Sequence, residues 1–422
     1  NNPNAIYIDG KLVLGVGTGG NHIVVDPVSG EVEEDLKFRK RACTRLTATA
    51  DSIFCRGEGT LRFDRATKKV FVDGGVRPAC NDGVLPANGL LYIGPWQCDC
   101  NLSLIGAMGK CSAGTFRFNL LATEAERLDV RAADLMKVTP LSIQAADWST
   151  YRGDNSRSAG SPAKVPQNLG PRWSFAPSRA NVPVAPTTAG GLVFLAGEDG
   201  KVRALKSGSG ELHWEFSTSA PIKNPPSIWE GRAYLGSGDG YVYCLEAATG
   251  KLLWRFRAAP VERQIMVYGR LSSTWPVNTG VMVHEGVAYF AAGIIDHDGT
   301  YVYALDAKTG KIKWQNNSSG HLSGELRKGI SAQGNLTVLG DQLLLAGGNQ
   351  VSPAIYDIKT GECRSKPFAQ GQPKANGGQF VGVYNNVSVI AGGRILYSDP
   401  RNVATKGKFT IFAEKKALQM NY

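Results

Sequence analysis

One phrase recurs along the second half of this chain. Residues 239–256 read DGYVYCLEAATGKLLWRF, and residues 299–316 read GTYVYALDAKTGKIKWQN. A third copy contains KVRALKSGSGELHW, and a degenerate copy reads AIYDIKTGECRSKPF. Self-similarity of this kind indicates one supersecondary unit used several times, so the chain is expected to pack copies of that unit side by side.

Each copy carries the same strand and turn signals. An apolar run such as RAYLGSG meets an Asp-Gly turn, then an alternating strand such as YVYCLE, then a Thr-Gly turn and a strand that ends in tryptophan. Alternation with period two indicates strands, and Asp-Gly between such strands indicates a hairpin. One copy is therefore predicted to be an antiparallel sheet of about four strands, which buries its apolar faces by packing against neighbouring copies.

Tryptophans mark the repeat. Trp214, Trp254 and Trp314 stand 40 and 60 residues apart, and a glycine precedes each by four residues. The longer step contains an insertion around residues 260–279, while Cys244 of one copy stands where the next has alanine. In that position Cys244 is expected to act as a small buried hydrophobe.

The phrase YVYALDAKTGKIKW resembles the repeat of the PQQ-like (quinoprotein-type) β-propellers. The resemblance is specific over residues 182–318 and weaker from 330 onward, and WSTYRGDNSRSAG resembles the start of bacterial PQQ-like repeat proteins. It implies an all-β propeller of four-stranded antiparallel blades with one short helical insertion. It also implies that Trp214, Trp254 and Trp314 dock each blade against its neighbour.

Counting these steps predicts eight blades, or seven if one end is incomplete. The predicted blades are residues 1–36, 44–75, 80–118, 182–218, 222–258, 276–318, 330–367 and 376–422. We expect residues 408–419 to pair beside the first residues and close the ring. Since the chain starts at Asn1 with strand-like sequence, we also expect residues upstream to be missing.

Three regions are predicted along the chain. Residues 1–118 form Cys-rich N-terminal blades, and residues 173–422 form the PQQ-like repeat blades that close the same propeller. Between them, residues 119–172 form a helical insertion and an inter-blade crossing loop. The first half of 119–145 lacks turn signals and contains good helix formers, which predicts a short helix.

Six of the eight cysteines lie within the first 111 residues. These disulfide candidates are Cys43, Cys55, Cys80, Cys98, Cys100 and Cys111. Disulfides formed in an oxidising compartment are the preferred interpretation, and a thiolate metal site or free thiols are the alternatives. The connectivity stays open; the favoured pairings join Cys43 with Cys80 or Cys55, and Cys98 or Cys100 with Cys111.

The net charge of +11 favours either an anionic partner or an ordinary basic protein. The positive charge is dispersed and accompanies no nucleic-acid module, so no specific nucleic-acid partner is expected. Association with an anionic membrane surface stays open. No apolar run approaches the length of a membrane-spanning helix.

Irregular segments supply the candidate ligand face. The insertion at 260–279 is expected to project from one face, where its aromatic rings and guanidinium groups can stack sugars or bind carboxylates. The alternative is a packed loop that plugs the channel. The ligand-face candidates are Trp96, Tyr151, Arg152, Arg263, Tyr268, Arg270 and Trp275.

Cofactor and metal signals are weak. Asp296 and Asp298 in IIDHDGT resemble a calcium loop, but the Glu of a full EF-hand pattern is missing, and a turn is the favoured interpretation. In quinoprotein dehydrogenases the resemblance would imply a Ca²⁺ ligand set, a catalytic Asp and an adjacent Cys pair, and no adjacent cysteines occur here. We expect no cofactor, with PQQ and Ca²⁺ as the alternative, and no catalytic residue can be assigned.

The resemblance implies a role like that of cofactor-free relatives that serve as assembly subunits. We therefore predict a bacterial binding or scaffold subunit in the periplasm, on the cell surface or outside the cell. Its partner would be a protein in a larger assembly, a glycan or another anionic ligand. The alternatives are a quinoprotein dehydrogenase or polysaccharide-acting enzyme with its site at the channel, and a structural module of a surface layer.

Overall fold

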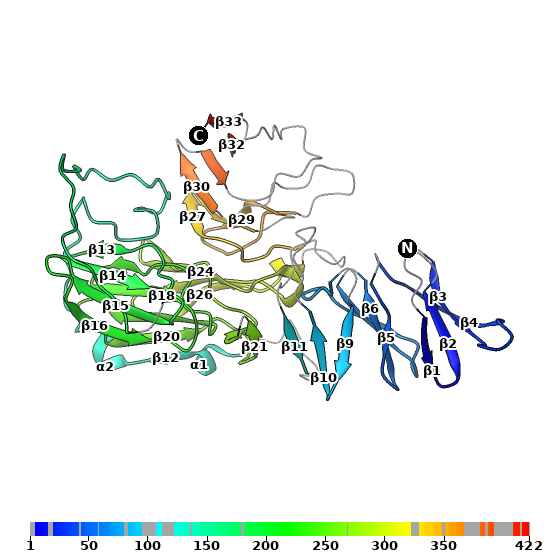
Figure 1. Ribbon diagram of the computed structural model, residues 1–422. Coiled ribbons are helices and arrows are strands. Elements are labelled where there is room, and N and C mark those ends of the chain that lie inside the picture. Colours follow the sequence, from blue (N-terminus) through cyan, green and yellow to red (C-terminus); the bar gives the residue numbers. More distant parts are fainter. Residues whose placement is uncertain are drawn as a thin grey trace. The chain divides into compact units, whose positions relative to one another are not determined.

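The computed structural model in Figure 1 describes most of the chain, in two compact units. The first unit is Asn1–Arg117 with Met266–Arg270, and the second is Phe118–Ile265 with Leu271–Tyr422. From residue 384 onward, and at residues 132 and 134, the backbone alone is described. The described residues are 5–15, 20–41, 44–57, 59–79, 83–94, 107–111, 122–135, 137–178, 181–267, 269–321, 329–347, 351–366, 380–384, 387–391, 408–413 and 416–421.

The first unit contains three antiparallel sheets in chain order. The first sheet is β1 (Ala5–Ile8), β2 (Lys11–Gly15), β3 (Asn21–Val25) and β4 (Val32–Arg39). The second is β5 (Thr47–Ala48), β6 (Ser52–Arg56), β7 (Thr60–Asp64) and β8 (Val70–Asp73). The third is β9 (Val84–Ala87), β10 (Leu90–Ile93) and β11 (Met108–Lys110).

The second unit contains five sheets, each again built from successive strands. The first two are β13 (Thr187–Ala189), β14 (Leu192–Ala196), β15 (Lys201–Lys206) and β16 (Leu212–Ser217), and then β17 (Ser227–Trp229), β18 (Arg232–Gly236), β19 (Tyr241–Glu246) and β20 (Leu252–Arg257), which β12 (Leu128–Val130) joins at the β20 edge. The third is β23 (Met282–His284), β24 (Val287–Ala292), β25 (Tyr301–Asp306) and β26 (Ile312–Asn316). The last two are β27 (Leu336–Leu339), β28 (Gln342–Leu345) and β29 (Ala354–Asp357), and then β30 (Phe380–Tyr384), β31 (Val387–Ala391), β32 (Lys408–Ala413) and β33 (Lys416–Asn421).

Short elements complete the description. They are the hairpin β21 (Gln264–Val267) with β22 (Arg270–Ser273), the helices α1 (Glu124–Arg127) and α2 (Ala132–Leu135), and the 3-10 turns η1 (Asp296–Asp298) and η2 (Ser319–His321). The predicted all-β class is therefore confirmed, and each predicted blade segment contains one sheet. The number of blades in a closed ring stays a prediction.

The expected pairing of the C-terminal strand with the first residues stays a prediction. Within the described sheets, β32 pairs with β31 and β33, and β1 pairs with β2. Four successive antiparallel strands at 380–421 form one sheet.

The insertion is less helical than predicted. α1 and α2 are single turns, and between them β12 pairs antiparallel with β20, with Asp129 opposite Arg255. The Asp129 carboxylate lies 3.2 Å from Arg255 Nε. An open sheet edge offers unpaired backbone groups to any extended segment, and here this edge outweighs the helix propensity of the sequence.

The core of the second unit lies between consecutive sheets. One apolar cluster joins the first two sheets and includes Phe194, Trp214 and Leu245, and another joins β23–β26 to β27–β29. Cys244 is fully buried, as Ala304 is at the equivalent position, which confirms its predicted role. Among the described residues, no helix is long and apolar enough to cross a bilayer.

Candidate functional site

The repeat tryptophans join neighbouring sheets of the second unit. Trp214 donates its indole N–H to the carbonyl of Ala247 at 3.0 Å. Trp314 makes the same bond to Ile358 at 3.0 Å. In each pair the acceptor lies just after the third strand of the following sheet. These indoles are consumed by packing and hydrogen bonding, so they offer no face to a ligand.

A glycine receives each of these rings. Gly250 has φ +75°, and a Cβ built there would stand 2.6 Å from the Trp214 ring. Gly310 has φ +74° and faces Trp254 in the same way at 2.9 Å. Two independent features therefore require glycine at each of these positions. One is the positive φ of the backbone, and the other is the close approach of the indole ring.

Trp173 belongs to the same series, although it precedes the first predicted repeat blade at residues 182–218. Its indole N–H donates to the carbonyl of Ser207 at 2.9 Å, and its ring lies against Gly210. The signal was present in the sequence, because RWSF at 172–175 repeats the Trp-x-Phe step of HWEF at 213–216.

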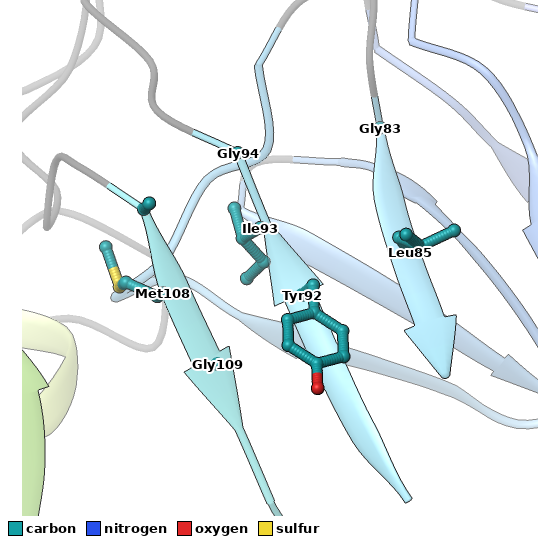
Figure 2. A pocket seen from close by; sticks show the side chains of 8 residues that line it. Gly83, Leu85, Tyr92, Ile93, Gly94, Met108 and Gly109 are labelled. Atoms are coloured by element: carbon teal, nitrogen blue, oxygen red, sulfur yellow. The ribbon is translucent and has the colours of Figure 1, made fainter. Parts of the chain in front are cut away.

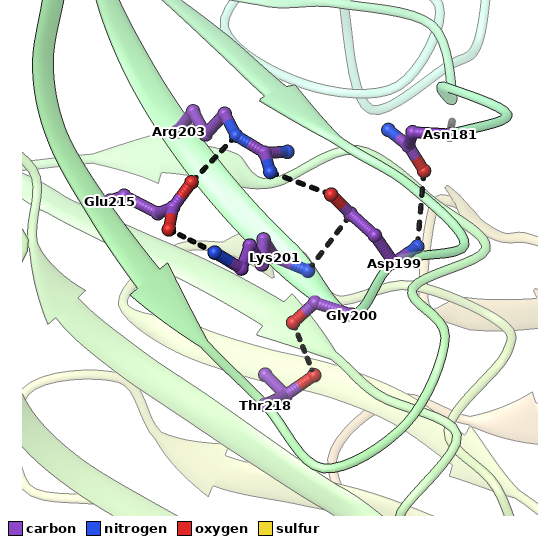
Figure 3. Close-up of polar contacts among 7 residues, drawn as sticks. All are labelled: Asn181, Asp199, Gly200, Lys201, Arg203, Glu215 and Thr218. Atoms are coloured by element: carbon purple, nitrogen blue, oxygen red, sulfur yellow. Dashed lines mark hydrogen bonds and ion pairs between the residues drawn. The ribbon is translucent and has the colours of Figure 1, made fainter. Parts of the chain in front are cut away.

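The Asp-Gly turns serve the local structure. Figure 3 shows Arg203 bonded to Asp199 at 2.6 Å and to Glu215 at 2.8 Å, with its side chain almost fully buried. In the next sheet, Asp239 accepts a hydrogen bond from the Tyr243 hydroxyl at 2.8 Å, and burial raises the pKa of Asp239. These carboxylates are engaged within their own sheets, which argues against a catalytic role.

Residues 148–157, here called the central segment, run along the first strands of the second unit's sheets. Those first strands lie beside one another in the series β13, β17 and β23, and again for β27 and β30. They form the ends of their sheets opposite the tryptophan strands. In a propeller the axis lies on this inner side.

The start of the central segment binds the first two sheets. The carbonyl of Trp148 accepts from Thr188 N in β13 at 2.9 Å, and the carbonyl of Ser149 accepts from Ile228 N in β17 at 2.7 Å. Backbone pairing of this kind holds the segment as an extension of the two inner edges.

The end of the central segment binds the other three sheets. Asn155 donates its side-chain amide to Val283 O in β23 at 2.7 Å and accepts, through its carbonyl, from the Thr337 hydroxyl in β27 at 2.6 Å. The carbonyl of Ser156 accepts from Val383 N in β30 at 2.8 Å. One short segment thus contacts the innermost strand of all five sheets.

Arg157 fixes this arrangement from inside. Arg157 is only 5% exposed. Its Nε donates to Leu336 O at 3.0 Å. One terminal nitrogen donates to the Thr150 hydroxyl at 3.0 Å and to Tyr151 O at 2.9 Å. Burial lowers the pKa of Arg157 to about 10. The Thr150 hydroxyl in turn lies 2.8 Å from the hydroxyl of Ser227.

The described contacts of the central segment show no Ca²⁺ ligand set of the kind a quinone cofactor would need. The polar groups of the central segment are bonded to each other and to inner-strand carbonyls and amides. None of these described contacts brings a carboxylate to the inner strands, and Ca²⁺ prefers carboxylate and other oxygen ligands. The central segment lies along the inner strands of the second unit.

The structure describes five of the seven predicted ligand-face residues, and a common ligand face stays a prediction. Tyr151 is half-buried in the central segment, and exposed Arg152 holds its guanidinium 4.4 Å above the Phe380 ring. Arg263 is half-buried and Arg270 is exposed on β22. Trp96 and Tyr268 lie outside the described residues.

Trp275 requires a correction. It is fully buried, its indole N–H donates to the carbonyl of Asp298 at 2.6 Å, and its ring meets Tyr301 edge-on. A ring buried in this way cannot stack on a sugar at an open surface. At Trp275 the end of the insertion packs into the core, while plugging of the channel stays a prediction.

The two calcium candidates lie in η1. The Asp296 carboxylate is buried and accepts from Gly329 N at 3.0 Å, while its backbone N–H donates to the Ser331 hydroxyl at 2.9 Å. Burial raises the pKa of Asp296, which disfavours its charged form. These contacts give Asp296 a structural use in the turn.

Two of the disulfide candidates are free thiols in the structure. Cys55 is fully buried in the apolar core of the first unit beside Leu61 and Phe63, and burial raises the pKa of its thiol to about 12. Cys111 is exposed. The favoured pairings through these two are therefore not formed; Cys43, Cys80, Cys98 and Cys100 lie outside the described residues.

A hollow of about 700 Å³ lies on the third sheet of the first unit (Figure 2). Leu85 and Tyr92 on neighbouring strands are 62% and 38% exposed. The lining is apolar, so it suits contact with another apolar surface and supplies no general acid or base at neutral pH. Its lining residues are Gly83, Leu85, Tyr92, Ile93, Gly94, Ala107, Met108 and Gly109.

Solved structures of several proteins resemble the chain. Quinohemoprotein alcohol dehydrogenase from Comamonas testosteroni is 17% identical, with a TM-score of 0.48 over 69% of this chain and 52% of that one. BamB from Moraxella catarrhalis is 11% identical, with a TM-score of 0.40 over 99% of this chain and 87% of that one. The chain spans about half the length of the quinohemoprotein alcohol dehydrogenases it matches.

No curated protein matches the sequence. A family model of PQQ-like repeats, described as outer membrane protein assembly factor BamB, matches residues 167–406. The match covers more than half of the chain, so the protein belongs to this PQQ-like β-propeller family.

Proposed function

We propose that the protein is a non-enzymatic binding subunit that holds a partner protein in a larger assembly. The observation that carries this proposal is the central segment, which bonds to the inner strands of all five sheets of the second unit. The polar groups of the central segment in these contacts are already paired with the protein itself. Binding is therefore assigned to the outer surface.

A partner protein suits that surface better than a small ligand. The described hollow is lined mainly by apolar residues of one sheet, whereas a small-molecule site needs concave burial with a few convergent polar groups. The family's description as an assembly factor supports the same assignment. It also supports a place outside the cytoplasm, at a bacterial outer membrane.

Two measurements on the purified full-length protein test the proposal. Titration with PQQ and CaCl₂, followed by quinone absorption, is expected to give no saturable binding. Chemical crosslinking in the cells that make the protein, followed by native mass measurement, is expected to give a complex with one stoichiometric partner. Stoichiometric quinone binding with alcohol oxidation, or a protein that stays alone after crosslinking, would overturn the proposal.

A further inference from the structure

Residues 158–172, here called the arm, are all exposed. The arm leaves the sheets of the second unit after the buried Arg157 and returns at Trp173, whose indole is bonded to Ser207 (Figure 1). It contains neither helix nor strand. Long exposed loops without regular structure are uncommon in compact folds and are usually either functional or linkers. Anchoring at both ends lowers the ordering cost when such a segment binds.

The arm exposes apolar side chains among positive charges. Val165 and Leu169 are 75% and 76% exposed. Lys164 and Arg172 are its charged residues, and the sequence contains no Asp or Glu between Asp154 and Glu198. A surface that combines apolar side chains with one sign of charge fits a partner with apolar pockets and acidic residues.

The backbone of the arm has its hydrogen-bonding groups available. The last internal bond within it runs from Ala163 N to the Ser161 hydroxyl at 3.1 Å. Among the described contacts, residues 164–172 make no hydrogen bond with the rest of the protein. An extended segment with unpaired N–H and C=O groups can add as a strand to an open sheet edge.

The prolines decide which edge of such a strand can pair. In a strand, residues two apart present their N–H and C=O groups to the same side. Pro162 and Pro166 lie at even positions, so the even edge lacks two of its donors and keeps only those of Lys164 and Asn168. The odd edge, formed by Ala163, Val165, Gln167 and Leu169, keeps every donor from 163 to 169.

The same alternation sorts the side chains. Ala163, Val165, Gln167 and Leu169 fall on one face of the strand, while Lys164, Pro166 and Asn168 fall on the other. The chain bends at 167–168 in the free protein, so full pairing requires this bend to straighten. A precedent stands in the same unit, where β12 adds to the open edge of β20.

We propose that the arm binds a partner protein by adding residues 163–169 as one strand to an open sheet edge of that partner. Val165 and Leu169 enter apolar pockets, and Lys164 meets an acidic residue. The proline edge faces away and prevents a second strand from joining. This inference rests on the proposed function and names the surface that performs it.

A pair of proline substitutions tests the proposal. The partner is first trapped by a photocrosslinking amino acid at position 165 in the producing cells, with position 28, also highly exposed, as the control site. The trapped protein is then purified and its affinity for the full-length chain is measured. Gln167→Pro removes a donor from the pairing edge and is expected to weaken binding at least tenfold. Asn168→Pro removes a donor from the other edge and is expected to change binding less than threefold.

Amide exchange in the complex gives a second readout that does not depend on substitutions. The amides of Val165, Gln167 and Leu169 are expected to become protected, while those of Lys164 and Asn168 continue to exchange. Equal losses for the two proline variants, or protection without alternation, would overturn strand addition. So would a self-associated dimer of this chain as the trapped species. If neither variant changes the affinity of the partner, the arm is not the binding surface, and the proposed function is unaffected.

Discussion

Trp254 in β20 donates its indole N–H to the carbonyl of Ala307, 3.2 Å away at the end of β25 in the next sheet. The Tyr234 hydroxyl donates to the same carbonyl at 3.0 Å. One carbonyl oxygen thus links two consecutive sheets. The ring of Trp254 packs on Gly310, the glycine of the turn between β25 and β26. This contact repeats at the periodicity of the sequence, which is why the repeat is readable.

The turn glycines under these indoles are predicted to be more sensitive than other glycines of the same conformation. Gly250→Ala places a Cβ against the Trp214 ring, while Gly191→Ala at φ +78° has open space around it. The backbone cost of about 1–2 kcal/mol is common to both, and overpacking adds about 1–3 kcal/mol at Gly250. Urea unfolding followed by tryptophan fluorescence compares the two. Equal loss of unfolding free energy would contradict the docking role.

Arg157 is predicted to be the most sensitive side chain of the central segment. Arg157→Met leaves Leu336 O and Tyr151 O without their charged donor, and the expected loss in unfolding free energy is at least about 3 kcal/mol. Arg152→Met is the matched control, because Arg152 is exposed and its ring contact is worth about 1 kcal/mol. Chemical denaturation of both variants checks the difference. A small effect at Arg157 would mean that the segment is not fixed from inside.

The stability of the first unit is predicted to fall in mild acid because of His22. This ring is fully buried, stacks on Phe38 with centroids 4.2 Å apart, and places Nδ1 2.9 Å from Phe38 O. Burial, opposed by that hydrogen bond, lowers the pKa of His22 below its ordinary value of 6.5. The folded state therefore binds fewer protons than the unfolded state.

Stability from His22 is present above pH 6.5 and decreases as the pH falls toward the folded pKa, by up to about 1.4 kcal/mol per pH unit. Calorimetry of the full chain between pH 7.5 and 5 measures this decrease. In His22→Phe, which keeps the stacked ring, the part of the slope due to His22 is expected to vanish, while the part due to His321, whose pKa is also lowered by burial, remains. A variant that retains the wild-type slope would assign the effect to another group.

The described cysteines are predicted to react in a fixed order. Exposed Cys111 should be alkylated within minutes in the native protein, whereas buried Cys55 and Cys244 should react only on unfolding, since burial raises the pKa of both thiols. Peptide mass mapping with and without prior reduction reads out each site. Protection of Cys111 that reduction removes would restore the disulfide interpretation for it.

The repeats made the sheets predictable, and the irregular segments did not. Asp-Gly and Thr-Gly turns mark the ends of strands locally, so each predicted blade contains one sheet. β12 was missed because its sequence favours a helix and its strand form depends on the edge of β20, 120 or more residues away. Such a long-range contact leaves no local signal.

The same reasoning explains the outcome for the candidate site. The sequence around Tyr151 and Arg152 resembles a family motif, but its composition predicts an exposed loop. Burial of Arg157 follows from backbone carbonyls such as Leu336 O, supplied by a strand far along the chain. Trp275 was placed at an open mouth for a related reason, since nothing in its neighbourhood announces that Asp298 and Tyr301 cover it.

Amide hydrogen exchange at Ile228 and Val383 tests the central claim most directly. Both amides donate to the central segment, to Ser149 O and Ser156 O, at 2.7 and 2.8 Å. If that segment lies along the inner strands of the second unit, both are expected to exchange as slowly as the amides within β18 and β19. Exchange at the rate of an open loop would show an unoccupied inner edge, and the assignment of binding to the outer surface would then lose its basis.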